Sequence, residues 1–160
     1  MMTIANQSTR IFCMVWLLFV CAAFLQGATT VINKDQTLKT SPEWQAHYDE
    51  YQPDEGLLLT WQAKIGENLA IEVYLGTWCS DSRNNVPPLM KLLDSLEQGR
   101  VAVKYHDVPR KASADVKYYV EELKVERVPT FIFYRDGQEI GRIVENPQKS
   151  MLEDFIEIIF

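Results

Sequence analysis

The pattern of apolar and polar positions between Leu69 and Phe160 switches repeatedly between strand-like and helix-like periods. Leu69–Leu75 is a nearly continuous apolar run and Val101–Tyr105 is a shorter β-rich run, so both are predicted to be strands. Cys79–Leu96, which lies between them, has helical spacing, as does Ala112–Leu123 after the second strand. This order predicts parallel strands that are joined through helices.

The C-terminal third of the chain adds a hairpin and a final helix. Val128–Tyr134 and Glu139–Val144 favour strands, and the Asp136-Gly137 pair between them is a strong hairpin signal. Ser150 begins a capping box. Apolar residues then recur at helical spacing, at Leu152, Phe155, Ile156 and Ile159. We therefore expect an α/β fold with a mixed central sheet, helices on both faces, and a C-terminal β-hairpin followed by a helix.

Two further helices are predicted before the first strand. Ser41-Pro42 is typical of a helix start, and this helix is expected to end near Tyr51. A second helix is expected after Pro53-Asp54. Residues 29–40 are polar and are interpreted as a linker, so the domain is expected to span residues 41–160 with an N-terminal helical extension. The sequence leaves open whether these helices extend the core or shield the site.

The first 28 residues have the features of a secretory signal peptide. Arg10 precedes the apolar run Ile11–Leu25, and the small residues Gly27 and Ala28 follow it. The run is shorter than the roughly 20 residues that a membrane-spanning helix prefers. An uncleaved N-terminal membrane anchor is the alternative. In both cases we expect an exported domain, periplasmic or extracellular.

Composition and cysteine usage narrow the chemistry. The chain has 160 residues and a formal net charge of −6, and no basic stripe that would favour nucleic acid as a partner. Cys13 and Cys21 belong to the signal segment, which leaves Cys79 as the only cysteine of the exported domain. One cysteine together with His47 and His106 lacks the spacing of a zinc site, so no metal and no cofactor are expected.

Cys79 lies where a strand ends and a helix begins, within Trp78-Cys79-Ser80-Asp81-Ser82. The unpaired N–H groups at a helix N-terminus favour a thiolate, and Arg83 adds to this effect while Asp81 opposes it. Cys79 is therefore the candidate nucleophile. The alternative for Cys79 is a small buried hydrophobic residue. Asp81 and the serines at 80 and 82 are equally consistent with ordinary first-turn residues of a helix.

These motifs resemble those of the thioredoxin family over Leu69–Phe160. The resemblance rests on the strand that runs into Trp78-Cys79, on Pro87 eight residues after the cysteine, and on Val128-Pro129-Thr130 at the start of the hairpin. It implies a thioredoxin-like fold, a cis peptide bond before Pro129, and a site at which an extended client segment pairs with the neighbouring backbone. The residues that it implies shape this site are Trp78, Ser80, Asp81, Ser82, Arg83, Val128, Pro129 and Thr130.

Two positions depart from the family pattern. Ser82 replaces the second cysteine of the dithiol motif, so no second sulfur is placed to release a mixed disulfide. Val73 stands where thioredoxins often bury an acid, and the adjacent Glu72 points to the opposite face of the strand.

The resulting hypothesis is an exported monothiol thiol–disulfide exchange protein that acts through Cys79. Its partners would be client proteins or small thiols, and an external thiol would resolve the mixed disulfides. The main alternative is a redox-inactive module that uses the same groove to bind peptides or proteins. An iron–sulfur or thiol-cofactor carrier is a third alternative, which an oxidising compartment disfavours.

Overall fold

The computed structural model describes residues 30–96, 100–110 and 119–160. The signal segment predicted over residues 1–28 lies outside the described residues, and so does most of the helix predicted over Ala112–Leu123. Residues 119–121 of that segment are helical. No helix among the described residues is long and apolar enough to cross a membrane.

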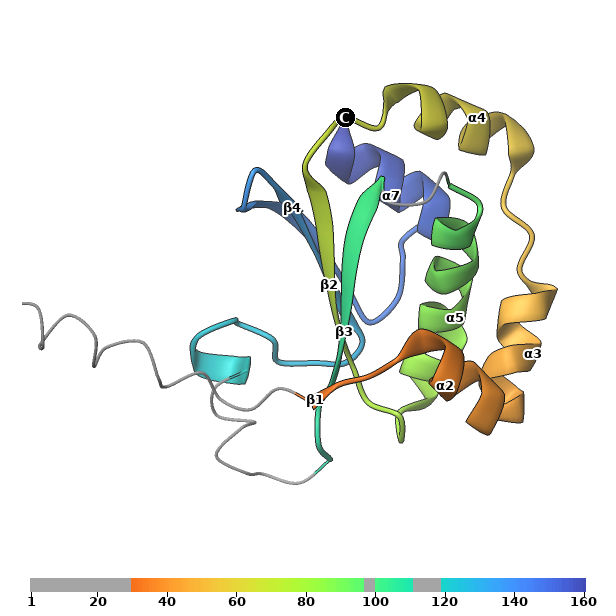
Figure 1. Ribbon diagram of the computed structural model, residues 1–160. Helices are drawn as coiled ribbons and strands as arrows, with labels where there is room; N and C mark the ends of the chain where they lie inside the picture. Colours follow the sequence, from red (N-terminus) through yellow and green to blue (C-terminus); the bar gives the residue numbers. More distant parts are fainter. Residues whose placement is uncertain (1–29, 97–99, 111–118) are drawn as a thin grey trace, which may run out of the picture.

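Five strands form one mixed sheet in the order β1-β3-β2-β4-β5 (Figure 1). The central strand β2, Leu69–Leu75, pairs in parallel with β3, Val101–Asp107, and antiparallel with β4, Thr130–Arg135. β5, Gln138–Val144, continues the sheet from β4 through a tight turn, where Asp136 and Gly137 both adopt positive φ angles (51° and 77°). The predicted mixed α/β sheet with its C-terminal hairpin is confirmed.

The labelled helices all lie on one face of the sheet (Figure 1). They are α2 (Lys34–Thr40), α3 (Pro42–Glu50), α4 (Glu55–Lys64), α5 (Ser80–Asp94) and α7 (Met151–Ile159). Side-chain caps fix two of the predicted starts, because Asp54 accepts the Leu57 N–H and Ser150 accepts the Glu153 N–H. The helical residues 119–121 lie on the opposite face (Figure 1).

Residues 30–40 are not a linker. They form the two-residue strand β1, Thr30–Val31, and the helix α2, which Asn33 caps by accepting the Gln36 N–H. β1 pairs antiparallel with the end of β3, and Leu38 of α2 is buried in the main core. The interpretation of this segment as a linker was wrong because its order comes from pairing and packing with distant residues.

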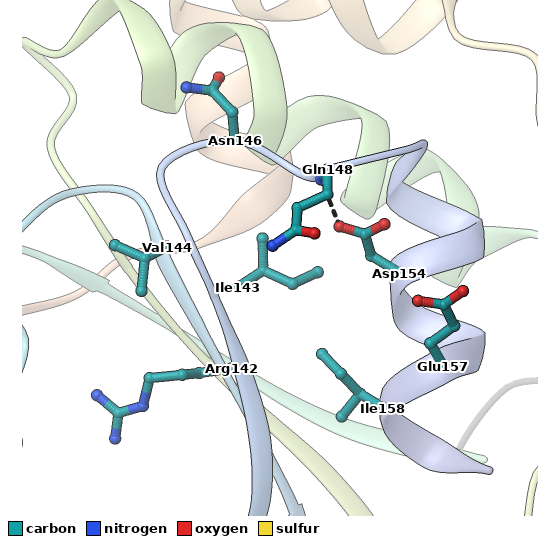
Figure 2. A pocket seen from close by; sticks show the side chains of 8 residues that line it. All are labelled: Arg142, Ile143, Val144, Asn146, Gln148, Asp154, Glu157 and Ile158. Atoms are coloured by element: carbon teal, nitrogen blue, oxygen red, sulfur yellow. Dashed lines mark hydrogen bonds between the residues drawn. The ribbon is translucent and has the colours of Figure 1, made fainter.

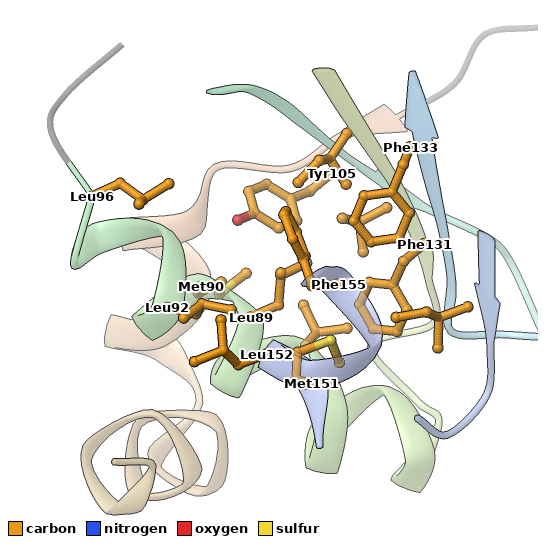
Figure 3. Close-up of a cluster of buried hydrophobic side chains, with 14 of the residues drawn as sticks. Leu89, Met90, Leu92, Leu96, Tyr105, Phe131, Phe133, Met151, Leu152 and Phe155 are labelled. Atoms are coloured by element: carbon orange, nitrogen blue, oxygen red, sulfur yellow. The ribbon is translucent and has the colours of Figure 1, made fainter. Parts of the chain in front are cut away.

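The main core lies between the sheet and the helices (Figure 3). Alternate residues of β2 face it, and so do α5 and α7. Phe155 of α7 is fully buried and packs edge-on against Trp61 of α4 and Phe133 of β4, with ring centroids 4.7 Å apart in both pairs. One aromatic residue thus joins the C-terminal helix to the N-terminal extension and to the sheet.

The N-terminal helices hold α5 at both ends. Glu43 of α3 forms an ion pair with Arg83 in the first turn of α5. At the other end of α5, the Asp94 carboxylate accepts hydrogen bonds from Lys34 (2.5 Å) and from the Tyr48 hydroxyl (2.6 Å). Partial burial and the hydrogen bond to Asp94 raise the pKa of Tyr48 to about 12. The extension therefore braces the helix that begins at Cys79.

His106 lies on the opposite face of the sheet, stacked on Tyr74 at a centroid distance of 4.7 Å. Neither of its ring nitrogens has a hydrogen-bond partner among the described residues, and Glu72 lies 3.9 Å away. Burial lowers the pKa of His106, an effect to which Lys104 adds and which Glu72 opposes.

Acidification from about pH 8 to about pH 6 is expected to destabilise the fold through His106. The His106 imidazole binds a proton at a higher pH in the unfolded chain than in the folded chain, because burial lowers its pKa in the folded chain. The free energy of unfolding therefore decreases as the pH falls through 6.5, the ordinary histidine pKa. Urea unfolding midpoints across this range measure the effect. His106→Phe, which keeps an aromatic ring on Tyr74, should flatten the pH dependence, whereas His47→Gln should retain it. An unchanged pH dependence in His106→Phe would contradict this assignment.

Candidate active site around Cys79

Cys79 is the N-cap residue of α5 and follows β2 through a tight connection. Its N–H donates to the Gly76 carbonyl and its own carbonyl accepts the Arg83 N–H. Gly76 is required here, because a Cβ at this position would lie 2.7 Å from the Trp78 ring. Cys79 is a free, half-buried cysteine. The strand-to-helix junction thus leaves the sulfur accessible at the helix N-terminus.

The start of β4 forms the opposite side of the site. Thr130 pairs with Tyr74 of β2, which brings the preceding Val128-Pro129 segment beside Cys79. The Val128–Pro129 peptide bond is cis, and the Cys79 thiol donates to the Val128 carbonyl at 3.4 Å. Thr130 is buried and its hydroxyl donates to the Arg127 carbonyl (2.7 Å). The structure therefore brings Cys79 together with Val128 and Pro129.

The remaining first-turn residues of α5 have different surroundings. Ser80 is exposed, whereas Ser82 is fully buried and its hydroxyl accepts the Gly76 N–H at 3.1 Å. Asp81 lines the groove beside Cys79. Arg83 does not line it, because its guanidinium is paired with Glu43 of α3.

Trp78 forms one wall of the site. Its indole N–H donates to the Val108 carbonyl (2.9 Å), which fixes the ring orientation while the side chain stays 40% exposed. The Arg110 guanidinium lies over the ring, 5.4 Å from its centroid. Trp78 thus offers a flat, partly exposed surface next to the thiol.

A groove of about 340 Å³ runs past Cys79. Its lining includes Trp78, Val108 and Arg110, which are in contact through the Trp78 ring. It also includes Val128 and the ion-paired Arg127 and Glu145. Tyr119 and Val125 also line it. Both belong to a second, smaller cluster of buried apolar residues, which includes Tyr74 of β2.

Sequence reasoning missed Asn85 and Glu145, which connect the two sides of the site. The Asn85 amide donates to the carbonyls of Asp81 (3.0 Å) and Glu145 (3.2 Å). The Glu145 N–H donates to the Pro129 carbonyl (2.7 Å), and its carboxylate pairs with Arg127 (2.7 Å). Glu145 adopts a φ of 61°, a conformation that favours glycine. Since Glu145 is not a glycine, no local signal marks this turn.

A second hollow, of about 390 Å³, lies between β5 and α7 (Figure 2). Its charged groups are already engaged. Asp154 accepts the N–H groups of Gln148 and Lys149, Glu157 pairs with Lys149, and Arg142 pairs with Glu139. Within residues 30–96, 100–110 and 119–160, no group of three His, Cys, Asp or Glu residues is arranged to hold a metal ion. Of these two hollows, the groove is the one lined by the candidate nucleophile, Cys79.

Comparison with known proteins shows which family the chain is similar to. A family model described as Thioredoxin matches residues 28–154. A thioredoxin H-type from Fagopyrum esculentum is 32% identical over 83 residues, which is 52% of this chain and 66% of the relative, slightly less than two thirds of its length. A thioredoxin from Staphylococcus aureus is 25% identical over 95 residues, covering 59% of this chain and 86% of the relative.

Among solved structures, Fasciola hepatica thioredoxin matches with a TM-score of 0.44 and 24% identity, covering 64% of this chain and 91% of that protein. The family assignment rests on the family model, which spans the whole sheet, the helix that begins after Cys79 and the Val128-Pro129 segment. The chain therefore belongs to the thioredoxin family.

Proposed function

We propose that this protein is an exported, monothiol thiol–disulfide exchange protein whose nucleophile is Cys79. The thioredoxin-like fold supports a thiol–disulfide oxidoreductase-like role in general. The observation that carries the monothiol proposal is the position of the Cys79 sulfur, which lies at the groove and 3.4 Å from the Val128 carbonyl, while a buried serine occupies position 82.

The first step forms a mixed disulfide. An extended client segment pairs with the backbone at Val128, which brings a client disulfide next to Cys79. The Cys79 thiolate attacks one sulfur of that disulfide, a new S–S bond forms, and the other client sulfur leaves as a thiolate. Cys79 reacts in this step as the thiolate, because the thiolate and not the thiol is the nucleophile in disulfide exchange.

The second step needs a thiol from outside the domain. The Ser82 hydroxyl is not a sulfur nucleophile, and it already accepts the Gly76 N–H. An external thiolate therefore attacks the client sulfur of the mixed disulfide, Cys79 leaves as a thiolate, and the client keeps the external thiol in a new disulfide. A small thiol such as a glutathione-like peptide, or a second client cysteine, supplies this reactant.

Replacing Cys79 by serine is expected to abolish covalent capture of clients. Wild-type protein incubated with a disulfide-bonded client should give an adduct on a non-reducing gel, with the summed mass by mass spectrometry. The Cys79→Ser protein should give none, because a hydroxyl does not undergo disulfide exchange. Persistent adducts in that variant would disprove the proposed nucleophile.

The same variant distinguishes the alternative of a redox-inactive binding module. Such a module would retain non-covalent client binding in Cys79→Ser and would lose it in Trp78→Ala. The proposed export, to the periplasm or to the outside of the cell, rests on Arg10 and the apolar run Ile11–Leu25. The intact mass of the protein recovered from its native compartment tests whether this segment is removed.

A further inference from the structure

We infer that the groove beside Cys79 is charge-polarised and selects clients whose cysteine has an acidic residue on the Trp78 side and a basic residue on the Asp81 side. This inference rests on the proposed function, since it describes which disulfides reach the sulfur fastest. It depends on the charged side chains that line the groove and on their partners.

The Trp78 end of the groove is positive. Arg110 is exposed and lies over the Trp78 ring, and no carboxylate among the described residues pairs with it. Asp107 is near this end, but its carboxylate accepts the Thr77 N–H (3.1 Å) and the residue does not line the groove. A client carboxylate at this end therefore meets an available guanidinium.

The opposite end of the groove is negative. Arg127 and Glu145 neutralise each other in a 2.7 Å ion pair. Asp81 and Glu126 also line the groove, so this end carries three carboxylates, those of Asp81, Glu126 and Glu145, against the one guanidinium of Arg127. Arg127 is hydrogen-bonded to Glu145 and also interacts electrostatically with Glu126, and no cation in the described part of the chain pairs with Asp81. Asn85 connects Asp81 to Glu145 through their carbonyls, so Asp81 and the Arg127–Glu145 pair lie at the same end.

The order of charges along the groove matters because backbone pairing fixes the direction in which a client segment binds. A strand that adds to the Val128 segment has a defined direction and cannot exchange its two ends without losing its hydrogen bonds. One order of flanking charges then matches both ends of the groove, and the reversed order opposes both. Exposed charge pairs are individually weak and are screened by salt. We therefore expect a rate difference of about fivefold at low ionic strength, which disappears at high salt.

The test uses two peptides of identical composition that differ only in order. Each carries one cysteine, activated as a disulfide with thionitrobenzoate, with Glu on one side and Lys on the other, two glycines away. Attack by Cys79 on the peptide sulfur releases the coloured thionitrobenzoate thiolate, whose absorbance gives the second-order rate constant. We expect one order to react about fivefold faster at low ionic strength and both to react equally in about 1 M salt.

Charge-swap variants assign the preference to the groove. Arg110→Glu combined with Asp81→Lys should reverse which peptide reacts faster, and Lys149→Gln, which removes a positive charge outside the groove, should leave the ratio unchanged. Circular dichroism confirms that each variant is folded. Equal rates for the two peptides at low salt would overturn the inference and leave the proposed function intact. A folded protein that reacts with neither peptide would overturn both.

Discussion

Replacing Ser82 by cysteine is expected to make release of the client independent of external thiol. Ser82 is one helical turn after Cys79 and is fully buried. It occupies the position of the second cysteine in the dithiol motif. A thiol held in that turn attacks the mixed disulfide intramolecularly, and such reactions have high effective molarities. In the absence of external thiol, the mixed disulfide should resolve roughly 100-fold faster than in the wild type. Mass spectrometry of samples quenched at successive times follows the loss of the adduct and gives this rate.

The same variant should contain an internal disulfide after one turnover, seen as a loss of two hydrogens from the intact mass. Ser80→Cys is the matched control. It adds a thiol in the same turn, but adjacent cysteines close a disulfide only with strained geometry. It should leave release dependent on external thiol. Resolution of Ser82→Cys adducts that still follows the concentration of added thiol would show that position 82 does not face the reacting sulfur.

Phe155→Ala is expected to lower the free energy of unfolding more than any substitution of an exposed residue does. The Phe155 ring is fully buried and contacts both Trp61 and Phe133 edge-on. Phe155→Ala removes both aromatic contacts and leaves a cavity, so the free energy of unfolding should fall by about 4 kcal/mol. Since domains of this kind are stable by about 5 to 15 kcal/mol, much of that margin is lost. Urea unfolding followed by tryptophan fluorescence gives the difference.

Two further variants separate burial from ring chemistry. Phe155→Leu keeps most of the volume and should cost about 1 kcal/mol. Phe160, five residues later, is 54% exposed, and Phe160→Ala should change stability by less than about 0.5 kcal/mol. A small loss in Phe155→Ala would mean that α7 repacks onto α4 without the ring.

The parts of the fold that were predictable carry their own local signal. β2 is a long apolar run, the β4–β5 turn contains Asp-Gly, and α7 begins with a capping serine. β1 has only two residues, both exposed, and is a strand because it pairs with Asp107 and His106. α2 buries one apolar residue, Leu38, against a core that forms elsewhere in the sequence. Neither element has a periodicity of its own, so the sequence pattern could not predict them.

The candidate site likewise contains some residues that could be predicted from the sequence and others that could not. Cys79 was found from its place between a strand and a helix, and Val128 and Pro129 from the family resemblance. Asn85 and Glu145 act through contacts with backbone far away in the sequence, and neither residue type indicates such a role. Arg83 was expected beside the thiol, but its charge is paired with Glu43 on a helix whose packing no local pattern specified.

The helices before the sheet restrict how other molecules reach the sulfur. α3 packs along α5, so that flank of the helix is closed to a second protein (Figure 1). Under the proposed function, a captured client would fill the groove beside Cys79. We expect such a client to exclude bulky protein reductants, while small thiols still reach the sulfur, so the small thiols of the compartment to which the protein is proposed to be exported would set how long each client is held.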